Sequence, residues 1–266
     1  MGSSIISLGL GLGGGKSATS SGSPPSGGAF SNTLSAYLDG SNELISVGDV
    51  SAINSASNVS ISGWFNASSF PHSTYNSLWG GGGEGDPNHP TRFWLSCNNS
   101  SYFRIFLGTS VNNTFAYSIS TDTWYNVVLT VDDASIKLYV NGSPAGSTYT
   151  NPHGTSLFAT AGDDFEIGSN PTYDTYEWNG YIDEFAVFNS TLTADNVTAI
   201  WNGGNGPTDL PVNPVNYWRM GDGTGDTDDG GGAPANGDTI GTIVDQAGSN
   251  NGTNPNGCVF SNEVPT

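Results

Sequence analysis

Residues 179–204, NGYIDEFAVFNSTLTADNVTAIWNGG, change from one kind of local structure to another part-way along. The first part, GYIDEFAVFN, is rich in aromatic and β-branched residues, which predicts a strand. The second part has helical spacing, with a capping threonine, three apolar residues on one face and a glycine that ends the helix: Thr193, Val197, Ile200, Trp201 and Gly203. The stretch therefore predicts a strand that leads into one short helix.

Strand patterns continue upstream of this stretch. The candidates are residues 36–47, 58–65, 123–133, 135–148 and 165–169. Asp39-Gly40 and Asn141-Gly142 supply tight-turn signals between short strands. In NVSISGWF (58–65), alternate residues fall on one face, and Trp64 and Trp124 lie within strands, where we expect them to be core residues. Short strands, regular turns and a single brief helix predict an all-β fold, an antiparallel β-sandwich.

The composition excludes several classes of function. Five Lys and Arg residues stand against 24 Asp and Glu, which gives a formal net charge of −19. Such a charge repels a phosphate backbone and an anionic bilayer, so we expect no nucleic-acid binding and no membrane insertion. Cys97 and Cys258 do not form a metal motif, and we expect them to be free buried thiols.

Residues 1–29 are rich in Gly and Ser and contain two consecutive prolines. This composition predicts an arm without a core of its own, which we expect a partner or a neighbouring subunit to order. The first residues lack the basic cluster of a signal peptide, so we expect synthesis in a cytoplasm.

The order of the segments resembles the laminin-G-like, concanavalin A-like lectin-glucanase jelly-roll modules. The segments that carry the resemblance are YLDGSNELISV, VSISGWF, TWYNVVLTVDDASIKLYVNG, FEIGS and NGYIDEFAVFNSTLTADNVTAIWNGG, which together span residues 30–204. Residues 205–266 form a linker and a C-terminal extension in which NYWRMGDG and VDQAGSNNGT resemble the opening of the same module. This extension either supplies a strand to its own sandwich or reaches a neighbouring chain.

The arm, the jelly roll and the YWRMGDG-type tail together resemble bacteriophage structural proteins, especially marine ones. That resemblance implies a noncatalytic protein on the virion surface, a capsid decoration or a fibre or appendage component, made in the host cytoplasm and released by lysis. It implies homo-oligomers, and capsid or tail proteins as partners through the arm. The alternative is a glycan-binding lectin for adhesion to cell-surface glycans, with calcium as the one candidate cofactor.

Catalysis has little support in the sequence. Glucanases of this superfamily use a Glu-x-Asp-x-x-Glu motif, but here Tyr181 and Ala186 occupy the positions of both glutamates around Asp183. A glycoside hydrolase is therefore a distant third hypothesis, and we expect no catalytic residues. The acidic run GDGTGDTDDGGG (221–232) does not fit an EF-hand, and we expect a solvated loop there.

The candidate ligand-binding residues fall into two groups. Jelly rolls of this type often bind calcium, and the carboxylates proposed for it are Asp183, Glu184 and Asp39. A sugar requires exposed aromatic rings with polar neighbours, and the residues proposed for a glycan or a subunit interface are Tyr173, Tyr176, Trp178, His89 and Arg92. The local alternative for the carboxylates is to accept hydrogen bonds from loop N–H groups.

Overall fold

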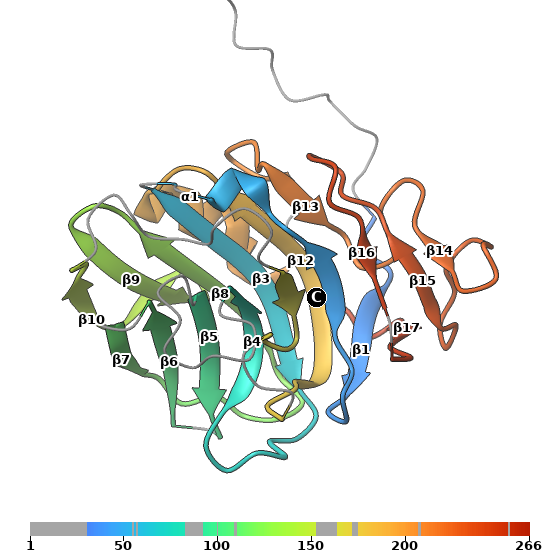
Figure 1. Ribbon diagram of the computed structural model, residues 1–266, viewed down its shortest axis with the longest axis horizontal. Helices are drawn as coiled ribbons and strands as arrows, with labels where there is room; N and C mark the ends of the chain where they lie inside the picture. The colour runs from blue at the N-terminus through green and yellow to red at the C-terminus, as the bar shows by residue number, and fades with distance from the viewer. Residues whose placement is uncertain are drawn as a thin grey trace, which may run out of the picture.

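The computed structural model describes residues 31–266 apart from 55, 57, 83–92, 100, 109–110, 153–163, 172–174, 207–208 and 255. Two antiparallel sheets pack face to face, and one α-helix, α1 (Ala194–Trp201), lies on the outside (Figure 1). Short 3₁₀ turns occur at Ser51–Ile53 and Asn202–Gly204. The predicted all-β sandwich with one short helix is confirmed. None of the helices in the described part of the chain has the length and apolar character needed to cross a membrane.

The first sheet, called sheet A, runs in the spatial order β10 (Ser143–Thr150), β9 (Ser135–Val140), β8 (Trp124–Val131), β3 (Val59–Ala67), β12 (Asn179–Phe188), β1 (Ser35–Asp39) and β17 (Val259–Ser261), with β13 (Asn216–Trp218) also paired to β12. The second, sheet B, runs β14 (Thr227–Asp228), β15 (Ile240–Ile243), β16 (Gly252–Thr253), β2 (Ile45–Gly48), β11 (Phe165–Ile167), β4 (Asn76–Gly81), β5 (Phe93–Asn98), β6 (Tyr102–Leu107) and β7 (Val111–Ala116).

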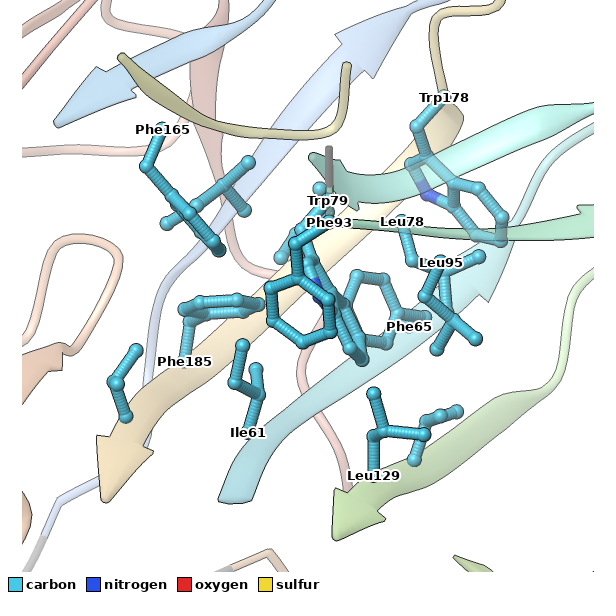
Figure 2. Packing of buried hydrophobic residues seen from close by; sticks show 14 of the residues in the cluster. Ile61, Phe65, Leu78, Trp79, Phe93, Leu95, Leu129, Phe165, Trp178 and Phe185 are labelled. Carbon is cyan, nitrogen blue, oxygen red and sulfur yellow. The ribbon is translucent and has the colours of Figure 1, made fainter. Parts of the chain in front are cut away.

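Large apolar side chains from both sheets fill the space between them (Figure 2). Alternation in β3 sends Ile61 and Phe65 into this core. The Phe65 ring lies 6.0 Å from Trp79 of β4 and 6.4 Å from Phe185 of β12, measured between ring centroids. Each fully buried side chain of this size contributes about 1.5–3 kcal/mol through removal of apolar surface from water.

The residues after 204 take part in both sheets of the same sandwich. β13 pairs with β12, β17 pairs with β1, and β16 pairs with β2. Of the two arrangements left open by the sequence, the structure has the one in which the tail packs on its own sandwich. The strand expected at the end of the chain is β17.

Several local expectations are corrected. The strands around Asp39-Gly40 exist, but β1 belongs to sheet A and β2 to sheet B, so the turn crosses between sheets. Helix α1 has the predicted Thr193 cap, with a capping box to Asn196, and at its end Asn202 (φ 47°) and Gly203 (φ 68°) both take left-handed conformations. Asp226 is 5% exposed rather than solvated, because its carboxylate accepts backbone N–H groups of Gly221, Gly223 and Val244 at 2.7–3.0 Å.

Cys97 and Cys258 are both free and buried, as expected. Burial raises the pKa of each thiol far above its ordinary value.

Candidate functional site

A β-bulge in β12 places two adjacent carboxylates on the outer face of sheet A. Asp183 pairs with Trp64 of β3, whereas Ala186 pairs with Ser62, so β12 holds one extra residue between these pairs. Glu184 takes up the extra length with a positive φ of 48°. Both side chains are nearly inaccessible, with Asp183 0% and Glu184 2% exposed.

The tail covers the bulge and neutralises one of the two carboxylates. Arg219, just after β13, donates from Nε and Nη2 to Glu184 Oε1 at 3.2 and 3.1 Å, and the Tyr217 hydroxyl donates to Oε2. Arg219 also donates to the Ser31 carbonyl at 2.8 Å. Burial raises the pKa of Glu184 to about 7, and Arg219 opposes that rise. The ion pair thus ties the tail and residue 31 to the centre of sheet A.

Asp183 has different partners. One of its oxygens accepts the Asn32 side-chain amide at 3.0 Å and the other accepts the Glu184 backbone N–H at 2.8 Å. Burial, together with the neighbouring charge of Glu184, holds the pKa of Asp183 well above its ordinary value. The bulge therefore contains two buried carboxyl groups, and both have a higher pKa than an exposed carboxyl group.

A groove of about 390 Å³ opens beside the bulge on the same face of sheet A. Three tryptophans line it: Trp64 of β3, which is 1% exposed, and Trp124 of β8 and Trp201 of α1, which are partly exposed. The other lining residues are polar or small: Asp122, Thr123, Asn141, Gly204 and Thr266. Figure 1 marks the C-terminus against the central strands of sheet A, in agreement with Thr266 in the lining.

The hairpin between β9 and β10 shapes one wall of this groove. Gly142 has a φ of 74°, and a Cβ on it would lie 2.8 Å from a carbon of the Trp201 ring. Asn141 Oδ1 accepts the backbone N–H of Asn126 at 2.9 Å, which fixes the turn on β8. A glycine is therefore needed for Trp201 to pack against the turn.

Polar atoms without hydrogen-bond partners gather around the groove. Within the described residues, the indole nitrogens of Trp64 and Trp124 have no acceptor, and the side-chain oxygens of Asn66 and Asn126 have no donor. Trp64, Asn66 and Asn126 are at most 3% exposed. Unpaired buried polar groups cost free energy, so these four atoms are available to a ligand or to water beside the groove.

The aromatic surface extends from the groove across sheet A. The Trp124 ring lies 6.2 Å from Tyr181 of β12, and Tyr181 lies 5.0 Å from Tyr37 of β1. All three side chains are partly exposed. Since β8 and β1 are three strand positions apart, the strip is about 14 Å long.

Comparison with known proteins identifies the family. Residues 39–198 match the Laminin_G_3 family, described as the concanavalin A-like lectin/glucanases superfamily. The chain belongs to this superfamily. A search of curated proteins found no match to the sequence.

Similar solved structures agree with a concanavalin A-like fold. A candidate carbohydrate binding protein from Bacteroides ovatus ATCC 8483 matches with a TM-score of 0.61 and 20% identity, over 88% of this chain and 61% of that chain. The CBM40 of the Ruminococcus gnavus IT-sialidase, bound to α2,3-sialyllactose, matches with a TM-score of 0.50 and 17% identity, over 65% of this chain and 99% of that one. The chain thus spans less than two thirds of the Bacteroides protein, and at these identities the likeness concerns the fold.

Trp178 and Tyr176, the two predicted glycan-binding residues that the structure describes, do not share one surface. Trp178 is 2% exposed, and its ring packs edge-on against Phe65 at 5.7 Å in the core, so the expected exposed platform is wrong there (Figure 2). Tyr176 is partly exposed on the outer face of sheet B. Tyr173, His89 and Arg92 lie outside the described residues.

The three calcium candidates do not assemble a calcium site. Asp39 pairs with Asn179, four positions along β12 from Asp183, which separates the two by roughly 13 Å. Glu184 is already paired with Arg219, and no group of three or more His, Cys, Asp or Glu side chains gathers in the described parts of the chain. Calcium requires six to eight oxygen ligands, which these residues do not offer together. The local alternative fits Asp39, whose carboxylate accepts the Ser41 N–H at 2.8 Å.

The sequence missed the residues that line the groove. Trp64 and Trp124 were expected in the core, and Trp201 on the buried face of the helix. In β3, however, Trp64 alternates with the core residues Ile61 and Phe65, and this parity already places it on the outer face. Trp201 lies beyond the buried Val197 and Ile200 and reaches the groove.

Proposed function

We propose that the protein is a noncatalytic carbohydrate-binding module whose ligand lies in the groove on sheet A. The observation that carries this proposal is the pair of partly exposed indole rings, Trp124 and Trp201, that line a groove of about 390 Å³. Ligand sites in proteins are typically concave and mostly apolar, with a few polar groups that fix orientation.

The lining suits the two kinds of surface that a sugar presents. Indole rings pack against the C–H face of a pyranose, and the tyrosines Tyr181 and Tyr37 extend this surface for further rings. Asp122, Thr123 and Asn141 supply oxygen and amide groups for hydroxyls. The described lining contains no Lys or Arg, which favours a neutral sugar. The similarity of fold to the Bacteroides protein and to the CBM40 also supports carbohydrate binding.

The arrangement of carboxylates supports a noncatalytic role. A retaining glycosidase needs two carboxyl groups about 5 Å apart that flank the scissile bond. Asp183 and Glu184 are instead buried side by side, with Arg219 bound to the second. Asp122 is the one acidic side chain among the groove residues named above.

Titration with neutral oligosaccharides tests the groove directly. A glycan array identifies the ligand, and calorimetry then compares the wild type with Trp124→Ala and Trp201→Ala. We expect each substitution to weaken binding at least tenfold, about 1.4 kcal/mol. Tyr102→Ala, a partly exposed tyrosine on β6 of sheet B, serves as the matched control and should bind normally. Unchanged affinity in both tryptophan variants would refute the groove as the site.

We further propose that the module is displayed on a bacteriophage particle as a homo-oligomer, held by its Gly/Ser-rich arm. The support is the resemblance of the arm and the tail to phage structural proteins, and a net charge of −19 that suits an exterior position. Deletion of residues 2–28 should abolish incorporation into particles while circular dichroism still reports a folded sandwich. Immunogold microscopy of a lysate with antibody to residues 30–204 gives the readout, and normal labelling of particles with the deletion would contradict the role of the arm.

A further inference from the structure

The outer face of sheet B carries a second aromatic surface, on the opposite side of the sandwich from the groove. We call it the Arg104 platform, and it consists of Tyr75, Trp94, Arg104, Phe106 and Tyr176. Trp94 and Phe106 face each other across β5 and β6, and their rings stack at 4.5 Å with 12° between the planes. Tyr176 stacks on Trp94 at 5.9 Å, and Tyr75 stands edge-on to all three rings.

Arg104 lies on these rings and is fixed by hydrogen bonds. Its guanidinium carbon is 5.4 Å from the centre of the Tyr75 ring and 5.1 Å from that of Phe106. Nη1 donates to the Tyr75 hydroxyl at 2.9 Å, and Nε donates to Asn112 Oδ1. The cation–π contacts and both hydrogen bonds hold the planar guanidinium group in one orientation without neutralising its charge.

The charge on Arg104 has no acidic partner among the described residues. The ion pairs found there are His72 with Glu177 and Arg219 with Glu184. Of the Lys and Arg side chains that the structure describes, only Arg219 has a carboxylate within ion-pair distance. Nη2 of Arg104 makes no hydrogen bond to a described residue either, and the side chain is partly exposed.

Two further observations favour a ligand at this position. Ser96 lies directly opposite Arg104 in the pairing of β5 with β6, is 0% exposed, and has a hydroxyl without a partner in the described structure. On the other side, the exposed polar residues Thr114 and Asn112 of β7 flank Arg104. Buried and exposed hydrogen-bonding groups thus surround one available cation.

We infer that the Arg104 platform is a second carbohydrate site, specific for sugars that carry a carboxylate. A guanidinium fork binds a carboxylate through two parallel hydrogen bonds, and the partly exposed rings of Tyr75 and Tyr176 offer faces for the apolar side of the same sugar. The amide of Asn112 and the hydroxyl of Thr114 are placed for sugar hydroxyls. A net charge of −19 repels polyanions such as nucleic acid more strongly than a sugar with one carboxylate, so the single acidic group is the better match.

The test compares acidic sugars with matched neutral ones on the full chain. The acidic probes are 3′-sialyllactose and methyl β-glucuronide, and the neutral probes are lactose and methyl β-glucoside. We expect the acidic sugars to bind at least tenfold more tightly, with an affinity that falls as salt is added. Equal binding of acidic and neutral sugars by the wild type overturns the proposal, as does binding of sodium acetate as tightly as either acidic sugar.

Two variants of one residue separate loss of the site from loss of the fold. Arg104→Lys keeps the positive charge but not the fork, and we expect about tenfold weaker binding of the acidic probes. Arg104→Gln removes the charge and should abolish their binding. Near-ultraviolet circular dichroism and the melting temperature confirm that both variants fold. Unchanged binding of the acidic probes by Arg104→Gln overturns the assignment.

The Trp124→Ala variant tests whether the acidic sugars bind at the Arg104 platform or in the groove. It should leave binding of acidic sugars unchanged while it weakens the neutral ligand of the groove. If Trp124→Ala instead abolishes acidic-sugar binding, the acidic probes occupy the groove and the platform proposal is wrong.

Discussion

Replacement of Arg219 by methionine isolates the electrostatics of the β12 bulge. Methionine keeps much of the apolar volume of the side chain but leaves Glu184, which is 0% exposed at its side chain, without a cation. Loss of one partner of a buried ion pair costs about 3–5 kcal/mol when the remaining group stays charged. The cost is therefore expected to depend on whether Glu184 is ionised.

The pKa of Glu184 gives the sign and size of this dependence. Burial raises it from 4.5 to about 7, which corresponds to about 3 kcal/mol. For a carboxyl group with a raised folded-state pKa, the contribution to stability is fully present below pH 4.5 and is lost as the pH rises through about 7. Removal of Arg219 raises the pKa of Glu184 further, so the stability of Arg219→Met continues to fall at pH values above 7.

Urea denaturation at pH 5 and pH 8, followed by tryptophan fluorescence, measures the effect. We expect Arg219→Met to lower the free energy of unfolding by about 1–2 kcal/mol at pH 5, where the guanidinium loses hydrogen bonds to a protonated Glu184 and to a carbonyl oxygen, but no ion pair. At pH 8, one unit above the wild-type pKa of Glu184, the loss should be larger by up to about 1.4 kcal/mol, which brings it to about 2–3 kcal/mol. An equal loss at both values would refute the argument from ionisation.

Glu184→Gln is the matched control for this experiment. Asp183 and Asp226 also have raised pKa values because of burial, so the wild type loses stability through several groups as pH rises. The difference in free energy of unfolding between the wild type and Glu184→Gln isolates the contribution of Glu184. This difference should change between pH 4.5 and 7. The free energy of unfolding of the double variant Glu184→Gln/Arg219→Met should differ from that of Glu184→Gln by the same amount at every pH.

Three further substitutions test the local geometry. Gly180→Ala would place a Cβ 2.0 Å from the Asn66 carbonyl oxygen at a φ of 143°, and it should destabilise the fold by more than about 3 kcal/mol in urea denaturation; a loss below 1 kcal/mol would contradict the close approach of β12 and β3. Thr193→Ala removes the helix cap and should cost about 1 kcal/mol in the same assay, whereas Thr193→Ser should cost little. Gly142→Ala would push Trp201 away from the turn. It should weaken ligand binding in the groove and leave ligand binding at the Arg104 platform unchanged. Calorimetry with one ligand for each site measures both effects.

The strands whose two faces differ in polarity were predictable, and those without such a difference were not. β3 is buried on both faces, but its outer face carries Ser60, Ser62 and Asn66 and its inner face apolar residues, so its position was clear from residues 58–65. β4 and β5 are buried on both faces, with Trp94 and Ser96 covered on the outside as well as Leu95 and Cys97 inside, and they show no alternation to detect.

The candidate site was harder to predict for a different reason. The sequence shows that Tyr176 and Trp178 are aromatic neighbours, but only the direction of each side chain decides that one reaches the surface and the other the core. Likewise, the pairing of Glu184 with Arg219 joins residues 35 positions apart, and neither local spacing nor composition specifies such a contact.

The position of β1 between β12 and β17 has a consequence for synthesis of the protein. Residues near Ser35 leave the ribosome early, but the Ser35 hydroxyl donates to the carbonyl of Glu263, 228 residues later. One side of β1 therefore has no partner strand until residues 259–261 have emerged, and an unpaired strand edge invites association with other chains. Sheet A can close only after these residues have emerged, and pairing over such a separation is slow. Until then the exposed edge of β1 makes aggregation compete with folding of the nascent chain.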